Sequence, residues 1–194
     1  MATKLLTPLG GGITLDAANT ATDKTVTIPA TTGTIALQET KITSGTAVAS
    51  TSGTSIDFTS IPSWVKRITV MFNGVSTNGT SPILFQLGAG SVTTSGYVGG
   101  ASRLGSASMN SITVSAGFGI YLGAAADTYG GSIVLTNINS NSWSANGVFG
   151  SGGGTMTFVC GGGIGLSGTL DRVRITTVNG TDTFDAGSIN ILYE

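Results

Sequence analysis

The sequence contains no histidine, and charged residues are scarce along all of its 194 positions. Without imidazole the chain cannot build a Ser-His-Asp or Cys-His nucleophile pair, a histidine-ligated metal site or a histidine pH switch. Asp, Glu, Lys and Arg make up 9% of the residues, compared with about 25% in an ordinary soluble domain. Since the net charge is −1, there is no basic surface to neutralise phosphates, and we expect no nucleic-acid partner.

Cysteine and long apolar runs are also nearly absent. Cys160 is the only cysteine, so the chain cannot form an internal disulfide. It lies in an apolar run, 156–160, which predicts a buried and unreactive thiol in a protein made in a reducing compartment. No apolar stretch reaches the roughly 18 residues of a bilayer span, and the first residues contain no apolar core of a secretory signal. We therefore expect a protein made in a cytoplasm, without membrane insertion.

Glycine, serine and threonine are abundant, with 31 Gly and 53 Ser or Thr residues. Residues that favour strands outnumber those that favour helices, and apolar residues alternate with polar ones in the segments 65–72, 170–178 and 189–193. This alternation predicts half-buried strands, and turn signals recur about every 8–12 residues. We predict an all-β fold, an antiparallel β-sandwich of jelly-roll-like type.

Four Asn-Gly pairs provide residues that tolerate a positive φ, and we predict a hairpin turn at each of them. They lie at positions 73–74, 78–79, 146–147 and 179–180.

The composition changes near residue 40, which divides the chain into a segment 1–40 and a domain 41–194. The first segment has only short strand signals, at 13–15, 25–28 and 34–37, separated by glycine- and proline-containing turns. Three strands of this length cannot close a core within one chain. We interpret residues 1–40 as a β-rich attachment or stem segment that gains its core by association, and residues 41–194 as a β-sandwich head.

One long interval of the head is almost uncharged. Among the 67 residues between Arg103 and Asp171, only Asp127 carries a charge. Solvent-facing surfaces of monomers usually carry Lys and Glu, so this interval favours burial in a core or against neighbouring subunits. An ordinary surface of Ser, Asn, Thr and Gly is the alternative.

Several aromatic residues lie in or beside predicted loops. Trp143, beside Asn141 in a polar loop, and Tyr129, before two glycines, would offer flat faces for stacking on a sugar ring if they were exposed. Tyr97 occupies a similar position, and we take Tyr97, Tyr129, Asn141 and Trp143 as candidate ligand-binding residues. Packing of each aromatic ring into the core is the alternative.

The carboxylates give little support for catalysis. Glycoside hydrolysis needs a pair of them, and Asp171, Asp182 and Asp185 are the nearest candidates. Asp-rich loops more often cap turns, or hold a weak Ca²⁺-type site, than cut sugars. A G-x-G-x-x-G pattern at 163–168 is followed by a strand pattern, whereas a dinucleotide site needs a helix there. We therefore expect no catalytic residue, no metal ion and no cofactor.

Three patches carry a family resemblance. The run 25–37 resembles a sequence segment that is common in tailed-bacteriophage fibre proteins; it reads Thr-Val-Thr-Ile-Pro-Ala-Thr-Thr-Gly-Thr-Ile-Ala-Leu. The segments 61–72 and 180–194 resemble the opening and closing strands of a β-sandwich at the distal ends of such fibres. The patches cover both ends of the chain, but not the middle, 88–170.

The resemblance implies a virion appendage, usually a homotrimer, synthesised in the host bacterial cytoplasm. Its N-terminal part would bind other virion proteins, and its C-terminal part would face the host surface, with a cell-surface glycan as a possible ligand. We expect a non-enzymatic tail-fibre or similar fibre subunit that mediates host attachment. A capsid decoration, head-fibre or neck protein without a host ligand is the first alternative. A capsule depolymerase is disfavoured because the chain is short and poor in carboxylates.

Overall fold

The computed structural model describes residues 42–105, 109–122, 124–125, 127–153 and 156–194, together with the backbone of two N-terminal strands. The chain divides into two units, Met1–Ala36 and Leu37–Glu194. In the first unit, β1 (Thr3–Leu6) pairs antiparallel with β2 (Gly12–Leu15). β2 confirms the strand expected at 13–15. The strands expected at 25–28 and 34–37, and the predicted boundary near residue 40, lie outside the described residues.

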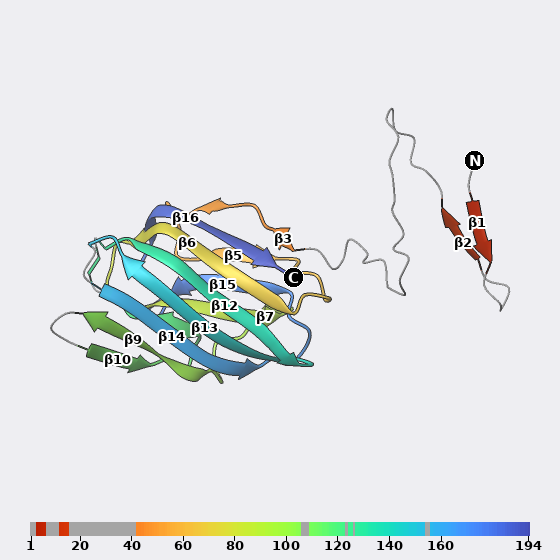
Figure 1. Cartoon of the computed structure of the whole chain (residues 1–194). Coiled ribbons are helices and arrows are strands. Elements are labelled where there is room, and N and C mark those ends of the chain that lie inside the picture. Colours follow the sequence, from red (N-terminus) through yellow and green to blue (C-terminus); the bar gives the residue numbers. More distant parts are fainter. Residues whose placement is uncertain are drawn as a thin grey trace, which may run out of the picture. The chain divides into compact units, whose positions relative to one another are not determined.

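The second unit consists of two antiparallel sheets that pack face to face, which confirms the predicted all-β sandwich (Figure 1). The larger sheet has nine strands in the order β10-β9-β14-β13-β12-β6-β16-β3, with β4 also paired to β16. The smaller has five strands in the order β11-β7-β15-β5, with β8 paired to β7. Over the residues described, no helix has the length and apolarity of a membrane span.

The strands of each sheet have the following bounds. The nine-stranded sheet contains β3 (Thr43–Ser44), β4 (Val48–Ala49), β6 (Arg67–Thr77), β9 (Val98–Gly105), β10 (Met109–Thr113), β12 (Tyr129–Asn139), β13 (Ser142–Ser151), β14 (Met156–Gly165) and β16 (Phe184–Tyr193). The five-stranded sheet contains β5 (Ile56–Thr59), β7 (Ile83–Ala89), β8 (Ser91–Val92), β11 (Phe118–Ile120) and β15 (Arg172–Thr177).

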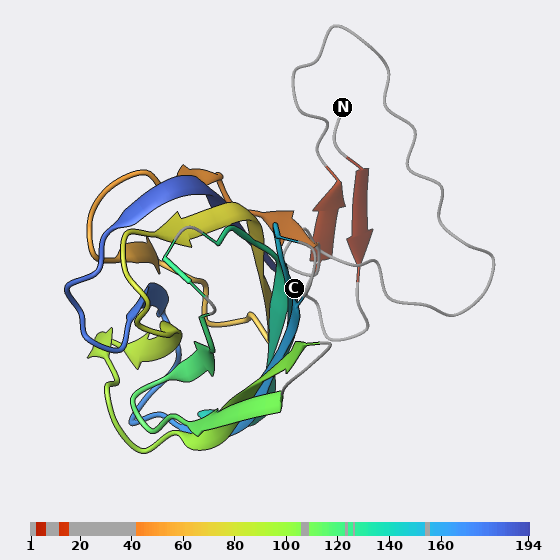
Figure 2. The ribbon, with the colours of Figure 1, turned by 90° about the vertical axis from the view of Figure 1, so that its left-hand side faces the viewer.

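The core lies between the sheets, because alternate residues of each strand point inward. Seen from one end, the nine-stranded sheet curls around the five-stranded one (Figure 2). Phe72 of β6, Phe149 of β13 and Phe85 of β7 join the two layers, with ring centroids 5.3–5.8 Å apart. All three side chains are buried. Aromatic packing of this kind stabilises the contact between the sheets.

The three strands expected from alternation are confirmed. β6, β15 and β16 occupy the segments that alternate in sequence, and β15 shows the predicted pattern in full, with Val173 and Ile175 buried and Arg172 and Arg174 partly exposed. Trp64 is partly buried against the core, and its ring centroid lies 6.0 Å from that of Tyr193.

The Asn-Gly pairs divide into turns and strand interiors. Asn179-Gly180 forms the predicted turn, with Gly180 at φ 66°. Asn73-Gly74 lies inside β6, where Gly74, at φ 65°, accompanies a register shift in the pairing with β16. Asn146-Gly147 lies in the middle of β13, so the turn predictions at 73–74 and 146–147 are wrong. A Cβ on Gly147 would crowd Cys160 and Ile133. Glycine at this position therefore allows these two side chains to pack closely against β13.

The sandwich has two distinct ends. At one end Thr43 pairs with Tyr193, and the chain enters the sandwich there. At the opposite end, which we call the loop end, lie the connections β4–β5, β6–β7, β9–β10, β11–β12, β13–β14 and β15–β16. The first residues of β3 therefore lie at the end opposite the loop end.

Candidate functional site

The outer surface of the five-stranded sheet carries charge. Arg174 of β15 donates two hydrogen bonds of 2.7 Å to the carboxylate of Asp57 on β5. Arg172 lies on the same strand and donates to Asp171 over 2.8 and 3.1 Å. These side chains are partly open to solvent. Such pairs are typical of a solvent-facing surface and add little stability.

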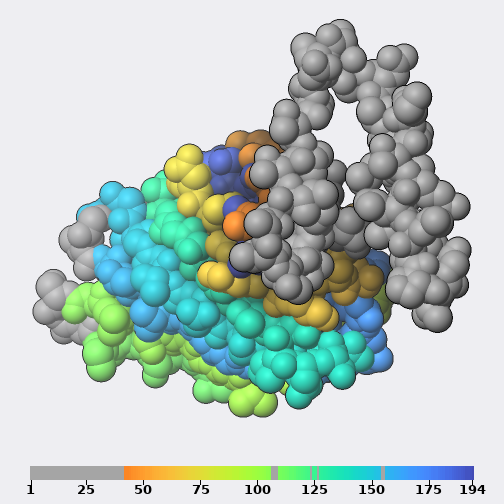
Figure 3. Space-filling view, turned by 45° about the vertical axis from the view of Figure 1, so that its right-hand side comes forward, coloured from red at the N-terminus to blue at the C-terminus, as the bar shows by residue number. Residues whose placement is uncertain are grey.

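The outer surface of the nine-stranded sheet is different. The four adjacent strands β9, β14, β13 and β12 contain one charged residue, Arg103. Arg103 pairs with the buried Phe158, lies 5.1 Å from the ring centroid of Tyr121, and has a buried Nε, so it faces inward. These strands follow one another across the surface (Figure 3). One row of outward side chains runs through Met71, Ser132, Val148, Val159, Ser102 and Ser111.

Exposed apolar side chains are concentrated on this sheet. Among the described residues eight large hydrophobic side chains are exposed, and five of them belong to β9, β10, β12 and β13. The five are Val98 (78% exposed), Met109 (78%), Ile138 (63%), Val148 (57%) and Leu104 (38%). We call the outward surface of β9, β10 and β12–β14 the uncharged face. The lack of charge together with these exposed apolar side chains makes the uncharged face a candidate interaction surface.

The candidate residue Tyr97 lies in the core. Its ring packs edge-on against Phe118, with centroids 5.0 Å apart. Its hydroxyl accepts a hydrogen bond from the Leu87 amide over 2.7 Å and donates to the Thr93 carbonyl over 3.1 Å. Burial raises the pKa of Tyr97 to about 12. The ring is therefore unavailable for stacking on a ligand.

Tyr129 and Trp143 are buried as well. Tyr129 faces inward from the start of β12, with its ring 5.3 Å from Phe158. Trp143 is 3% exposed and belongs to the inward series of β13. Of the two alternatives left open by the sequence, the structure shows packing into the core, because the alternation of their strands turns both rings inward. The alternation of Trp143, Ala145 and Phe149 was the sequence signal for this. Trp143 also lines the shallow hollow described below.

Asn141 is partly exposed, in the two-residue turn between β12 and β13, and its carbonyl accepts from the Leu166 amide over 3.0 Å. This turn lies opposite the loop end, whereas Tyr129 lies at the loop end. The four candidate residues therefore do not form one site.

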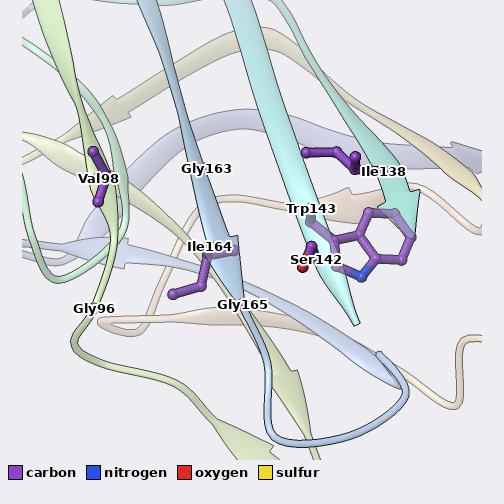
Figure 4. Close-up of a pocket in the computed structure, with 8 residues that line it drawn as sticks. All are labelled: Gly96, Val98, Ile138, Ser142, Trp143, Gly163, Ile164 and Gly165. Atoms are coloured by element: carbon purple, nitrogen blue, oxygen red, sulfur yellow. The ribbon is translucent and has the colours of Figure 1, made fainter. Parts of the chain in front are cut away.

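A shallow hollow of about 300 Å³ lies beside this turn, on the nine-stranded sheet. Figure 4 shows β14 passing between Val98 of β9 and the side chains of Ile138 and Ser142. Gly163 and Gly165 contribute no side chain there, so the hollow is lined mainly by backbone and apolar groups. These glycines belong to the G-x-G-x-x-G pattern and lie at the end of β14. The element that follows the pattern is the strand β15, as the sequence predicted, and not a helix.

A second hollow, of about 380 Å³, lies on the five-stranded sheet, and we call it the β7–β15 groove. Its lining is mostly polar and comes from β7, β15 and four loops. The residues are Thr54, Ser55, Leu84, Gln86, Thr94, Ala116, Arg174, Thr176, Thr177, Val178, Asn179 and Gly180. No sequence pattern indicated this site, because β7 and β15 are far apart in the chain.

Hydrogen bonds fix the polar groups of the groove. Gln86 is 5% exposed, and its amide donates to the Ala116 carbonyl over 2.8 Å. Thr176 donates to the Thr54 carbonyl over 2.8 Å. Asn179 accepts from the Thr177 hydroxyl over 2.8 Å and donates to Asp182 over 2.6 Å. Side chains held in this way need little ordering when a ligand binds.

The carboxylates considered for catalysis are engaged with neighbours. Arg172, with the amide of Gly90, holds the pKa of Asp171 below its usual range. Asp182 accepts from the Ser81 amide over 3.0 Å, and Asp185 accepts from the Ser76 hydroxyl. Within the described ranges no group of three or more His, Cys, Asp or Glu side chains could hold a metal ion.

Cys160 is buried, as predicted, and burial raises the pKa of its thiol to about 12. In the unfolded chain a cysteine ionises near pH 8.5. The folded state therefore binds the thiol proton more tightly, and this contribution to stability is complete below about pH 8.5 and lost as the pH rises to about 12.

We expect the free energy of unfolding to fall between about pH 8.5 and pH 11, and to fall less steeply in the variant Cys160→Ala. Urea denaturation at several pH values measures both slopes. Each protein is compared with its own value at pH 7, because the alanine also leaves a small cavity. Equal slopes in the two proteins would show that the thiol ionises normally in the fold.

No protein-family model, curated protein sequence or solved structure matches the chain.

Proposed function

We propose that this chain is a non-enzymatic subunit of a tailed-bacteriophage fibre, or of a similar virion fibre, that attaches the particle to the host surface through a trimeric head. The observation that carries the proposal is the contrast between the two outer surfaces of the sandwich. One surface holds the ion pairs of Asp57, Asp171, Arg172 and Arg174, and the other is the uncharged face.

The uncharged face fits a second copy of the same chain. Since the face carries no charge, contact between two copies would neither bring like charges together nor remove water from a charged group. Its exposed valine, isoleucine and methionine side chains would be buried on contact, which favours association. Its glycine positions, such as Gly161 and Gly163 of β14, permit close approach. The threefold number comes from the resemblance to fibre proteins.

The two ends of the sandwich support a direction for the head. Residues 1–40 would bind the rest of the virion, and the first strand of the sandwich, β3, begins at the end opposite the loop end. The loop end would then face the host. Weak binding by each of three heads would add up to strong attachment, because the copies are held together.

Immunogold labelling of purified virus particles tests this function. We expect label at the outer tip of a fibre. Label on the capsid shell would replace this proposal with the capsid decoration role, and absence of label from all particles would contradict both.

A further inference from the structure

We infer that the β7–β15 groove binds a neutral saccharide of the host surface, an inference that rests on the proposed function. If copies associate through the uncharged face, the outer surface of the five-stranded sheet faces away from the threefold axis. Each head would then present one open groove.

The chemistry of the groove selects the class of ligand. Hydroxyl groups of Thr54, Thr94 and Thr176 and amide groups of Gln86 and Asn179 suit a ligand that both donates and accepts hydrogen bonds. Sugar hydroxyls do both. Ala116 and Val178 add apolar surface for the carbon-bound hydrogens of a sugar ring.

The charges in the groove favour a neutral ligand over an acidic one. Arg174 is the only charged residue of the lining. It donates two hydrogen bonds to Asp57, from Nε and from one terminal nitrogen. The positive and negative charges of this pair cancel. An anion would have to compete with Asp57 for the guanidinium, and its binding would break hydrogen bonds between Arg174 and Asp57. The remaining N–H groups of Arg174 can donate to neutral hydroxyls.

The volume of the groove, about 380 Å³, is at the lower end of the range of small-molecule sites, about 300–1,000 Å³. It therefore suits one or two sugar rings. Affinity per groove would be modest, which agrees with attachment through several copies.

The variant Thr94→Trp tests the inference, because Thr94 is an exposed lining residue and a large ring there would obstruct the groove without entering the core. Thr59→Trp is the matched control: Thr59 is an exposed threonine of β5, on the same sheet but outside the lining. Arg174→Gln is a second variant that leaves the groove open and removes the guanidinium. Thermal unfolding checks that each variant is folded.

The probe is an array of neutral and uronic-acid-containing oligosaccharides of bacterial cell envelopes, applied to the full chain. We expect the wild type and Thr59→Trp to bind neutral oligosaccharides, and Thr94→Trp and Arg174→Gln to bind at least tenfold more weakly. If no neutral oligosaccharide binds, if only acidic ones bind, or if both groove variants bind like the wild type, the inference is wrong.

The two proposals can fail separately. Fibre-tip labelling together with unchanged binding by the groove variants would reject the groove and keep the fibre function. If the groove variants lose sugar binding but no virus particle is labelled, the groove would be kept and the fibre function rejected.

Discussion

The variant Val148→Arg is expected to dissociate the proposed trimer into single folded chains at micromolar concentration. Val148 is 57% exposed and lies at the centre of the row that crosses the uncharged face. In the proposed trimer an arginine there would bury an unpaired charge in each interface, at a cost of about 3–5 kcal/mol, which is more than a hundredfold in affinity. Sedimentation velocity gives the mass, and thermal unfolding shows whether the chain stays folded.

Val178→Arg is the control for this change. Val178 is 52% exposed and directly follows β15, in the other sheet. The same new charge at this position should leave the oligomer intact. An oligomer that survives Val148→Arg, or one that is lost equally in both variants, would show that the uncharged face is not the interface.

The variant Phe149→Ala is expected to lower the free energy of unfolding by about 3–5 kcal/mol, the range for large-to-small changes of buried aromatic residues. The Phe149 side chain contacts Phe72 in its own sheet and Phe85 in the other, so its loss leaves a cavity between the layers. Urea denaturation measures the effect. Because the domain as a whole is stabilised by about 5–15 kcal/mol, the variant should unfold at a much lower urea concentration.

Thr59→Ala is the matched control, since Thr59 is exposed on a strand and contributes nothing to the core. Its free energy of unfolding should change by less than about 0.5 kcal/mol. A loss below about 1 kcal/mol in Phe149→Ala would mean that these rings do not link the two sheets.

The fold class could be predicted from the sequence where alternation is strong. β15 shows this best, since the residues expected inside and outside lie there in the structure. The prediction failed at Asn146-Gly147 because the same dipeptide that favours a tight turn also fits a strand where neighbouring side chains need space. Cys160 and Ile133, which occupy that space, come from the adjacent strands.

The candidate site was less accessible to prediction, because exposure depends on tertiary packing. Trp143 follows a polar loop in sequence, yet the first residues of β13 already alternate and direct its ring into the core. The β7–β15 groove depends on the pairing of Gln86 with Arg174, which are neighbours only because β7 and β15 are adjacent in the sheet. No local pattern encodes that pairing.

A cryo-electron-microscopy reconstruction of the full chain in its assembled state tests the central claim most directly. We expect three copies around one axis, with β12, β13 and β14 of each copy covered by its neighbours and the β7–β15 groove open to solvent. A reconstruction in which the outer surface of the nine-stranded sheet faces solvent in every copy would contradict the account.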